Sequence, residues 1–264
     1  MIEIKSKREV ELMRSAGMVV AETLYVLCKA TEAGITTAEL NELAGKTIAE
    51  YGAESAFLNY SVDDNRVPYP GIVCISVNEE IVHGIPGPRK IESGDIVSFD
   101  VGTRLDGFCG DGAGTVIVGD VPKEVRKLVD VTRQSLYNGI EQADVGNRIR
   151  DIGRAVQVTA ESAGFGVVRE MVGHGIGKEV HEEPQVPNFV IGGFSPKLVP
   201  GITIAIEPMI TMGDWHLKEL NDKWTLVTVD GSLSAHFEHT VAVTEDGPLI
   251  LTLRKNGKAG FDLN

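Results

Sequence analysis

The chain has 264 residues, and its 38 acidic and 25 basic residues give a net charge of −13, which repels phosphate backbones and argues against specific nucleic-acid binding. Its composition, 42% hydrophobic and 24% charged, is that of a globular protein, and its three cysteines fit neither a disulfide framework nor a zinc ribbon. The N-terminus lacks a signal-peptide pattern and no apolar run could span a bilayer, so we expect a cytoplasmic protein without membrane contact.

Two capping boxes mark the starts of the first two helices. Ser6 with Glu9, and Thr36 with Glu39, have the spacing at which a hydroxyl and a carboxylate cap each other's backbone amides. Apolar residues recur at helical spacing after the first box. Gly52 is a suitable end for the second helix, because glycine readily takes the left-handed conformation found after helices.

Two further helices and several strands complete the predicted fold. Pro122 suits the first turn of a helix over residues 122–142, and a fourth helix is predicted over 145–164. Strand-like apolar stretches occupy residues 72–77, 95–101, 115–118, 202–206, 226–229 and 239–243. No linker or low-complexity tract divides the chain, so residues 1–264 are predicted to form one α+β domain.

A weak internal repeat places acidic residues at corresponding positions in the two halves of the chain. Asp100 and Glu207 each end an apolar strand, six residues after a glycine. Downstream of each lies a second acid before a Thr-Val pair, at Asp111 and at Glu238. This pattern favours two similar halves, each of which contributes two carboxylates to a shared centre.

The segment between the first two of these acids is predicted to be a β-hairpin, because Asp106-Gly107 is a strong turn signal. If the turn centres between Leu105 and Asp106, Asp100 faces Asp111 with Cβ atoms roughly 4.5–5.5 Å apart. Two facing carboxylates are destabilising unless they share a proton or a cation lies between them. A proton-sharing pair, as in aspartic proteases, and a bulge that leaves Asp111 in a loop are the alternatives.

The rest of the sequence favours a metal over a shared proton. His174 lies among glycines that permit close backbone approach, while Glu207 and Glu238 follow or precede apolar strands. Four carboxylates and one imidazole suit divalent ions such as Mn, Fe, Co or Zn. Bridging carboxylates also hold metal pairs in hydrolases, whereas the H-E-x-x-H pattern of single-zinc peptidases is absent.

Taken in order, seven segments resemble motifs of the type I methionine aminopeptidases: residues 82–86, 94–100, 106–111, 173–177, 181–186, 206–208 and 237–240. The resemblance covers essentially the whole chain. It implies the pita-bread fold, in which two pseudo-symmetric α/β halves surround a curved, mainly antiparallel sheet. It also implies a metalloexopeptidase that removes the initiator methionine from nascent proteins with a small second residue, through a hydroxide that bridges two metals.

The resemblance assigns two divalent ions (Co, Mn, Fe or Zn) to a set of five ligands, Asp100, Asp111, His174, Glu207 and Glu238. In this scheme Asp111 and Glu238 bridge the two ions. Catalytic roles fall to Glu207, which would move the water proton, to His181, which would donate to the developing oxyanion, and to His83, which would contact the scissile peptide group.

The methionine pocket implied by the resemblance includes Tyr69, Cys74 and Trp224. Two positions depart from the family pattern, because Phe57 replaces a smaller residue and Val180 replaces an aromatic one. Residues 61–68 also form a longer stretch than is usual, and we expect them to be a loop at the mouth of the pocket.

The expected substrate is the N-terminal methionine of a nascent chain, with transient ribosome contact, and the expected state is a monomer. A non-catalytic pita-bread protein that binds partners or RNA is the main rival, but such relatives lose metal ligands that are all present here. An imidodipeptidase or creatine-type hydrolase fits the chain length and the flanking motifs less well.

Overall fold

The structure is a computed structural model that describes residues 1–61 and 67–263. Its helices are α1 (Lys7–Ala30), α2 (Thr37–Glu50), α3 (Lys123–Ile140) and α4 (Ile149–Ser162). Over the described ranges, none of these helices combines the length and apolar character that crossing a membrane requires.

Both predicted capping boxes are present and fix the starts of α1 and α2. The Ser6 hydroxyl accepts a hydrogen bond from the Glu9 amide at 3.3 Å, and the Glu9 carboxylate accepts from the Ser6 amide at 2.8 Å. Thr36 and Glu39 form the same pair of bonds before α2. Each box satisfies amides that the first turn of a helix leaves without partners, so these two predictions are confirmed.

The third and fourth helices are shorter than predicted. Pro122 lies at the N-cap of α3, one position before the helix begins. Helix α4 starts at Ile149 and not at 145, because Gly146 has a left-handed φ of 94° that interrupts the helical path. The Asp151 carboxylate then accepts from the Arg148 amide at 2.9 Å and fixes the true start.

Within residues 1–61 and 67–263, the strands form four antiparallel sheets. The first contains β1 (Glu54–Ser55), β4 (Ile96–Leu105), β2 (Cys74–Val77) and β5 (Phe108–Ile117), with β4 at its centre. The largest has the order β15 (Gly247–Ile250), β14 (His239–Thr244), β9 (Thr203–Ile206), β7 (Gly173–Gly175) and β8 (Glu182–Val186). Two small sheets contain β13 (Ser234–His236), β10 (Met209–Thr211) and β6 (Gly166–Val167), and β11 (Leu217–Glu219), β12 (Leu226–Thr228) and β3 (Glu80–Val82).

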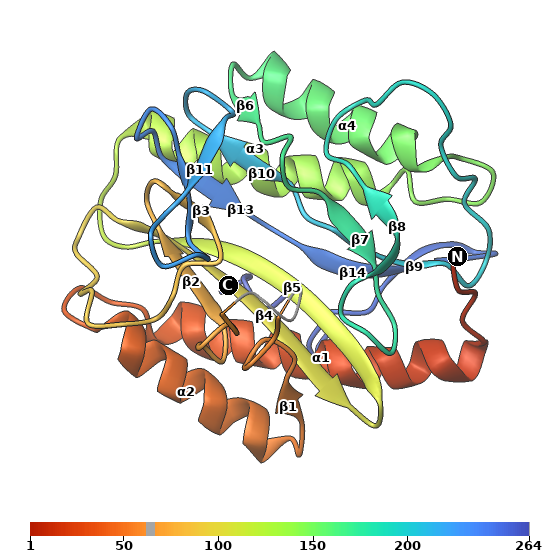
Figure 1. The fold of residues 1–264 in the computed structure, drawn as a ribbon, viewed down its shortest axis with the longest axis horizontal. Helices are drawn as coiled ribbons and strands as arrows, with labels where there is room; N and C mark the ends of the chain where they lie inside the picture. Colours follow the sequence, from red (N-terminus) through yellow and green to blue (C-terminus); the bar gives the residue numbers. More distant parts are fainter. Residues whose placement is uncertain (62–66, 264) are drawn as a thin grey trace.

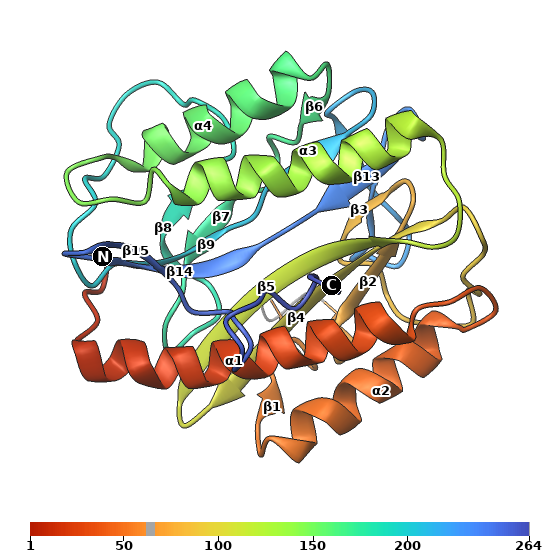
Figure 2. The ribbon, with the colours of Figure 1, turned by 180° about the vertical axis from the view of Figure 1, so that it is seen from behind.

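Helices cover one face of this curved arrangement in two pairs. Figure 1 shows α1 with α2 below the strands and α3 with α4 above them. Seen from behind, α1 and α3 lie in front of the long strands β4, β5 and β14 (Figure 2). The main hydrophobic core fills the space between the helices and the strands and includes Leu24, Phe99, Leu136 and Ile206. This arrangement is the pita-bread fold that the resemblance implied.

The β4–β5 hairpin forms as predicted, but with a different register. Asp106 and Gly107 both have positive φ values, 50° and 80°, and together form a two-residue turn centred between them. Asp100 therefore faces Ala113, and Asp111 faces Gly102. The prediction that the two aspartates face each other directly was wrong. They are diagonal neighbours on the same side of the sheet, and the ladder is continuous, without the bulge considered as an alternative.

Strand β5 extends well beyond the predicted residues 115–118, because its glycines allow close packing. A Cβ on Gly110 would lie 2.6 Å from the backbone nitrogen of Gly17 in α1. A Cβ on Gly114 would lie 2.7 Å from the side chain of Phe261. Glycine in a strand can mark such a close approach, so it does not end the strand here.

One long ladder in the second half of the chain is interrupted in its middle. Strand β9 pairs with β14 up to Ile206 and His239, and β10 pairs with β13 from Met209 and His236 onward, in the same register. The gap contains Glu207 and Glu238. The backbone of Glu238 instead exchanges two hydrogen bonds with Ala113 of β5, at 2.9 and 3.4 Å, so the two halves of the fold meet there.

Candidate metal centre

The strands bring the five predicted ligands together from both halves. Asp100 and Asp111 project from the same side of the β4–β5 hairpin, and Asp111 is only 3% exposed. Glu207 follows β9 and Glu238 precedes β14 at the interrupted ladder, and His174 lies in the adjacent β7. Glu207 and Glu238 are buried as well, at 9% and 2% exposure.

Short distances link the imidazole of His174 to this cluster. Its Nε2 atom lies 3.4 Å from Glu207 Oε1 and 3.8 Å from Asp111 Oδ2. Asp111, His174 and Glu238 each offer a ligand atom, and these atoms lie within 4.8 Å of one another. The diagonal register of the hairpin therefore still allows both aspartates to reach the cluster, with Asp100 beside Asp111.

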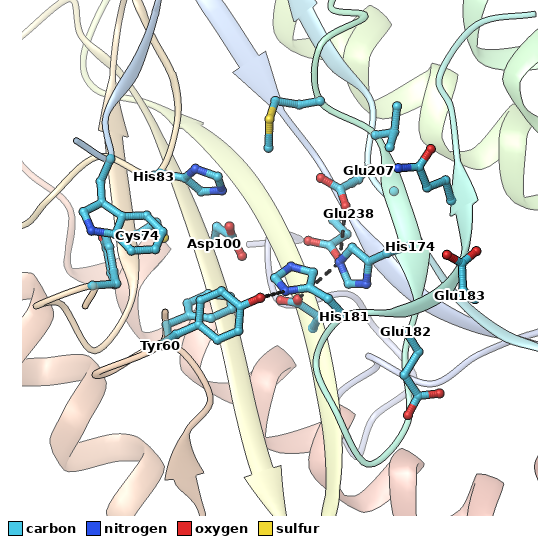
Figure 3. A pocket seen from close by; sticks show the side chains of 18 residues that line it. Tyr60, Cys74, His83, Asp100, His174, His181, Glu182, Glu183, Glu207 and Glu238 are labelled. Carbon is cyan, nitrogen blue, oxygen red and sulfur yellow. Dashed lines mark hydrogen bonds and ion pairs between the residues drawn. The ribbon is translucent and has the colours of Figure 1, made fainter. Parts of the chain in front are cut away.

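All of these side chains line one cavity of about 520 Å³. Figure 3 shows Asp100, His174, Glu207 and Glu238 around its centre, with His83 and His181 at its sides. The residues that complete the lining are Phe57, Tyr60, Tyr69, Cys74, Asp111, Met171, Val172, Gly173, Glu182, Glu183, Gln185 and Trp224. The cavity thus has an acidic centre and an aromatic side.

Burial raises the pKa of every carboxyl in the cluster. For Asp111, burial acts together with the negative charges of Glu238 and Asp100. For Glu207, burial acts together with the charges of Asp100 and Asp111, and Glu238 is raised by burial and by its acidic neighbours in turn. Four such groups cannot all ionise in a buried space without a compensating cation.

The donor set fits a metal, because oxygen atoms remain without partners in a buried place. Among the described residues, Asp100 Oδ1 and Glu238 Oε1 are buried and accept no hydrogen bond. Burying such atoms costs free energy unless something else binds them. Burial also lowers the pKa of His174 to about 3, so its imidazole is neutral and keeps a lone pair for an ion.

The two predicted catalytic histidines lie on either side of the acidic cluster. His181 is in the β7–β8 connection, open to the cavity on one side and enclosed by protein on the other, and this enclosure lowers its pKa. Its Nδ1 atom lies 2.7 Å from the hydroxyl of Tyr60. His83 follows β3 with a left-handed φ of 60°, and its ring meets that of Trp224 edge to face.

Comparison with known proteins shows the family to which the chain belongs. Residues 11–245 match the model of metallopeptidase family M24. A methionine aminopeptidase from Clostridium acetobutylicum is 48% identical over 254 residues, covering 96% of this chain and 99% of that protein. Methionine aminopeptidase 1 from Bacillus subtilis is 46% identical, with 96% and 99% covered. The chain belongs to the methionine aminopeptidases of family M24. Membership of a metallopeptidase family also implies a divalent metal.

Solved structures of methionine aminopeptidases agree with the fold. One from Thermotoga maritima superposes with a TM-score of 0.91 at 43% identity, covering 96% of this chain and 99% of that chain. A prolidase from Pyrococcus furiosus gives a TM-score of 0.74 at 20% identity, with 96% and 66% covered, and shares the fold alone. The comparisons confirm the family that the sequence motifs predicted.

Four of the five predicted pocket residues line the aromatic side of the cavity in this methionine aminopeptidase. Phe57, Tyr69, Cys74 and Trp224 are all buried there, and the rings of Tyr69 and Trp224 meet edge to face at 5.2 Å. Val180 packs in the same hydrophobic cluster but is not among the lining residues. Most of the predicted pocket loop, residues 62–66, lies outside the described residues.

Sequence reasoning gave no site role to two side chains near the centre of this methionine aminopeptidase. Tyr60 lines the cavity and contacts His181. His236 is buried, with Nε2 3.9 Å from Glu207 Oε2. Alternation along an extended strand was a usable signal for the latter, because residues two positions apart share a face and His236 precedes Glu238 by two.

Proposed function

We propose that this protein hydrolyses the first peptide bond of nascent chains that begin with methionine, and prefers a small second residue. The observation that carries the proposal is the convergence of four buried carboxyls and a neutral imidazole in a cavity with an aromatic wall. Such a cavity fits an unbranched apolar side chain on one side and a charged reaction centre on the other.

The five ligands would hold two divalent ions, of Co, Mn, Fe or Zn. Asp111 and Glu238 would be shared by both ions, Asp100 would bind one, and His174 with Glu207 would bind the other. The position of Asp111 supports this division, because its carboxyl lies beside Asp100 on one side and 3.8 Å from His174 Nε2 on the other. Carboxylates, unlike imidazoles, can bridge two ions with their two oxygen atoms.

When bound, the ions polarise the substrate carbonyl group and make water a nucleophile near neutral pH. Glu207 accepts the proton of that water and passes it to the leaving amine, the role of a general base and then of a general acid. His181 donates a hydrogen bond to the carbonyl oxygen as negative charge develops on it. His83, whose side chain lines the cavity beside Asp100 (Figure 3), contacts the scissile peptide group in this proposal.

The methionine side chain occupies the space between Phe57, Tyr69, Cys74 and Trp224. Tyr69 is held there through its hydroxyl, which donates to the carbonyl oxygens of Gly84 at 2.8 Å and Val73 at 3.2 Å. Phe57, larger than the residue usual in the family, narrows the pocket on one side. Val180, where the family pattern has an aromatic residue, packs in the hydrophobic cluster behind the lining residues.

Residues 1–264 act as one catalytic domain, because the ligands come from both halves and neither half holds the full set. The protein acts as a cytoplasmic monomer that meets its substrates at the ribosome through transient contacts. Its net charge of −13 favours brief contacts over stable binding to ribosomal RNA.

The test combines metal analysis with peptide turnover. We expect two ions per chain in the active enzyme, rapid hydrolysis of Met-Ala-Ser, and little hydrolysis of Met-Lys-Ser. Ala-Ala-Ser and N-acetyl-Met-Ala-Ser are matched controls for the side chain and for the free amine. Rapid hydrolysis of either control peptide, or full activity with a single ion, contradicts the corresponding part of the proposal.

A further inference from the structure

Tyr60 and His181 form a close pair at the edge of the cavity. The Tyr60 hydroxyl lies 2.7 Å from His181 Nδ1, and the two rings meet edge to face with centroids 5.1 Å apart. The other side of the His181 ring contacts His174, at a centroid distance of 4.4 Å. His181 therefore lies between Tyr60 and the acidic cluster (Figure 3).

The backbone holds Tyr60 firmly in this place. Its amide donates to the carbonyl of Phe57 at 2.8 Å, and its carbonyl accepts from the amide of Tyr69 at 2.8 Å. The amide of Asn59 donates to the carbonyl of Tyr69 at 2.9 Å. Tyr60 and Tyr69 thus form a backbone-paired base for the connection between them, and this pairing fixes the backbone from which the Tyr60 side chain projects.

The chemistry of the two groups decides which of them donates. A phenol hydroxyl is a strong donor and a weak acceptor, whereas the bare nitrogen of a neutral imidazole is a strong acceptor. Burial raises the pKa of Tyr60, with a smaller contribution from the charge of Glu179, so the phenol keeps its proton. The hydroxyl therefore donates to Nδ1, and the single proton of the neutral imidazole is on Nε2.

We propose that Tyr60 is a positioning residue that fixes His181 in the Nε2–H tautomer and in one ring orientation, which makes His181 a donor toward the substrate. A flipped ring, or the other tautomer, presents carbon or a bare nitrogen to the carbonyl oxygen and donates nothing. The inference rests on the proposed role of His181 and adds the group that sets its donor state.

The test is a double-mutant cycle with a control of the same type. Tyr60→Phe removes the hydroxyl and keeps the ring, and we expect kcat for Met-Ala-Ser to fall by about five- to tenfold, the effect of one net hydrogen bond. In a His181→Ala background the same substitution should change kcat by less than about twofold, because its target is gone. Tyr25→Phe in α1, where the ring lies against Arg254, should leave kcat unchanged. An equal loss in both backgrounds overturns the proposal.

A second measurement reports the tautomer without using activity. In zinc-loaded enzyme with ¹⁵N-labelled histidine, the His181 signals, identified by their absence in His181→Ala, should place the proton on Nε2. Tyr60→Phe should give signals averaged between the two tautomers. A proton on Nδ1 in the unsubstituted enzyme overturns the inference. Normal kcat in His181→Ala overturns only the proposed role of His181, so the two failures are distinguishable.

Discussion

Asp111 is the residue on which the candidate centre depends most. It is buried, it lies beside Asp100 on the hairpin, and its carboxyl is 3.8 Å from His174 Nε2. Asp111→Asn should abolish turnover and weaken binding of both ions, because an amide carries no charge and offers a single acceptor oxygen. His174→Ala should weaken one ion more than the other. Isothermal titration of the metal-free variants with Mn measures both effects.

The hairpin itself offers a matched control for this substitution. Asp106→Asn makes the same change at the exposed turn, where asparagine also tolerates the positive φ of 50°. We expect it to keep full metal binding and turnover. Full turnover of purified Asp111→Asn with added Co or Mn is the outcome that contradicts the two-ion assignment.

His181 should affect catalysis without affecting the metal. As a donor to the developing oxyanion it contributes in the transition state, so His181→Ala should lose roughly 10²–10³ in kcat, by analogy with other single oxyanion donors. Metal content, measured by plasma mass spectrometry, should stay the same. Loss of bound metal in this variant instead makes His181 a ligand and removes the role given to it.

The ligand types could be predicted from the sequence, but their supporting partners could not. Acids that follow apolar stretches are visible in a sequence as candidate ligands, and Glu207 does follow β9 as predicted. Asp100 does not end its strand as predicted, because β4 continues to Leu105 through the hairpin pairing. Tyr60 and His181 are 121 positions apart, and their hydrogen bond depends on how the β7–β8 connection folds over the first half. Such a pairing has no local pattern in the sequence, and neither has the approach of His236 to Glu207.

At the scale of elements, the N-terminal segment before α1 secures the connection that carries His181. The Lys5 ammonium lies 2.6 Å from Glu182 Oε2, and both side chains are largely buried, with 4% and 14% exposure. The Lys5 amide also donates to the carbonyl of Gly201, just before β9. Lys5 thus contacts both the residue that follows His181 and a residue just before the strand leading to Glu207.

Breaking this pair should cost stability. Lys5→Met leaves Glu182 buried without its partner, a change that costs about 3–5 kcal/mol for buried ion pairs. We expect the melting temperature to fall by roughly 6–15 °C, as measured by calorimetry. Lys7→Met, an exposed neighbour, is the control. The double variant Lys5→Met/Glu182→Leu should recover much of the lost stability. An unchanged melting temperature of Lys5→Met argues against a stabilising Lys5–Glu182 ion pair.

The connection between Tyr60 and Tyr69 carries the prediction for substrate selectivity. The Trp224 indole, which lines the cavity, donates to the carbonyl of Val67 at 2.8 Å, so the end of this connection lies beside the pocket. Deleting residues 62–66 should change KM or the tolerance for the second residue, while metal content is preserved. Kinetics across a panel of Met-X peptides measure this. Identical constants for the shortened and full chains leave the connection without a role in the site.

The hairpin shows where sequence reasoning about elements reaches its limit. The Asp-Gly pair correctly predicted the turn, but the register depends on which two residues form the loop. Here Asp106 and Gly107 both take left-handed conformations and form the loop. The turn therefore centres one residue later than predicted, and the partner of each residue shifts by two positions. The predicted strand over 115–118 left out the glycines of β5, because the helix that packs on Gly110 is distant in the sequence. Local patterns therefore located the elements, and tertiary packing set their lengths and register.

For the molecule as a whole, the metal should determine how stability depends on pH. Burial raises the pKa of Asp100 to about 7 and raises those of Asp111, Glu207 and Glu238 well above their usual values. A raised carboxyl pKa means that the metal-free fold binds protons more tightly than the unfolded chain, so stability is lost as pH rises through the folded-state values. The buried histidines, with lowered pKa values, act only below their unfolded value of about 6.5.

In EDTA, the melting temperature should therefore fall by roughly 5–10 °C between pH 6.5 and 8.5. This fall corresponds to a folded state that binds about one proton more than the unfolded chain over two pH units. With saturating Mn it should stay nearly constant, because the ions take the place of the protons. Glu238→Gln should reduce the slope of the metal-free protein. A metal-free melting temperature that rises over this range contradicts the burial of four ionisable carboxyls.

The meeting of the two halves at Ala113 and Glu238 also sets an order of events during synthesis. The five assigned ligands span positions 100 to 238, and the last of them reaches the centre only by pairing with β5 of the first half. A ribosome that has translated only the first half has released a hairpin with two of the assigned acids, but not His174, the assigned imidazole ligand. The complete ligand set forms only after residue 238 has emerged and docked. With this ligand assignment, metal binding by the full set would come late in the life of each molecule. An enzyme proposed to act on unfinished chains could then not work while its own chain is unfinished.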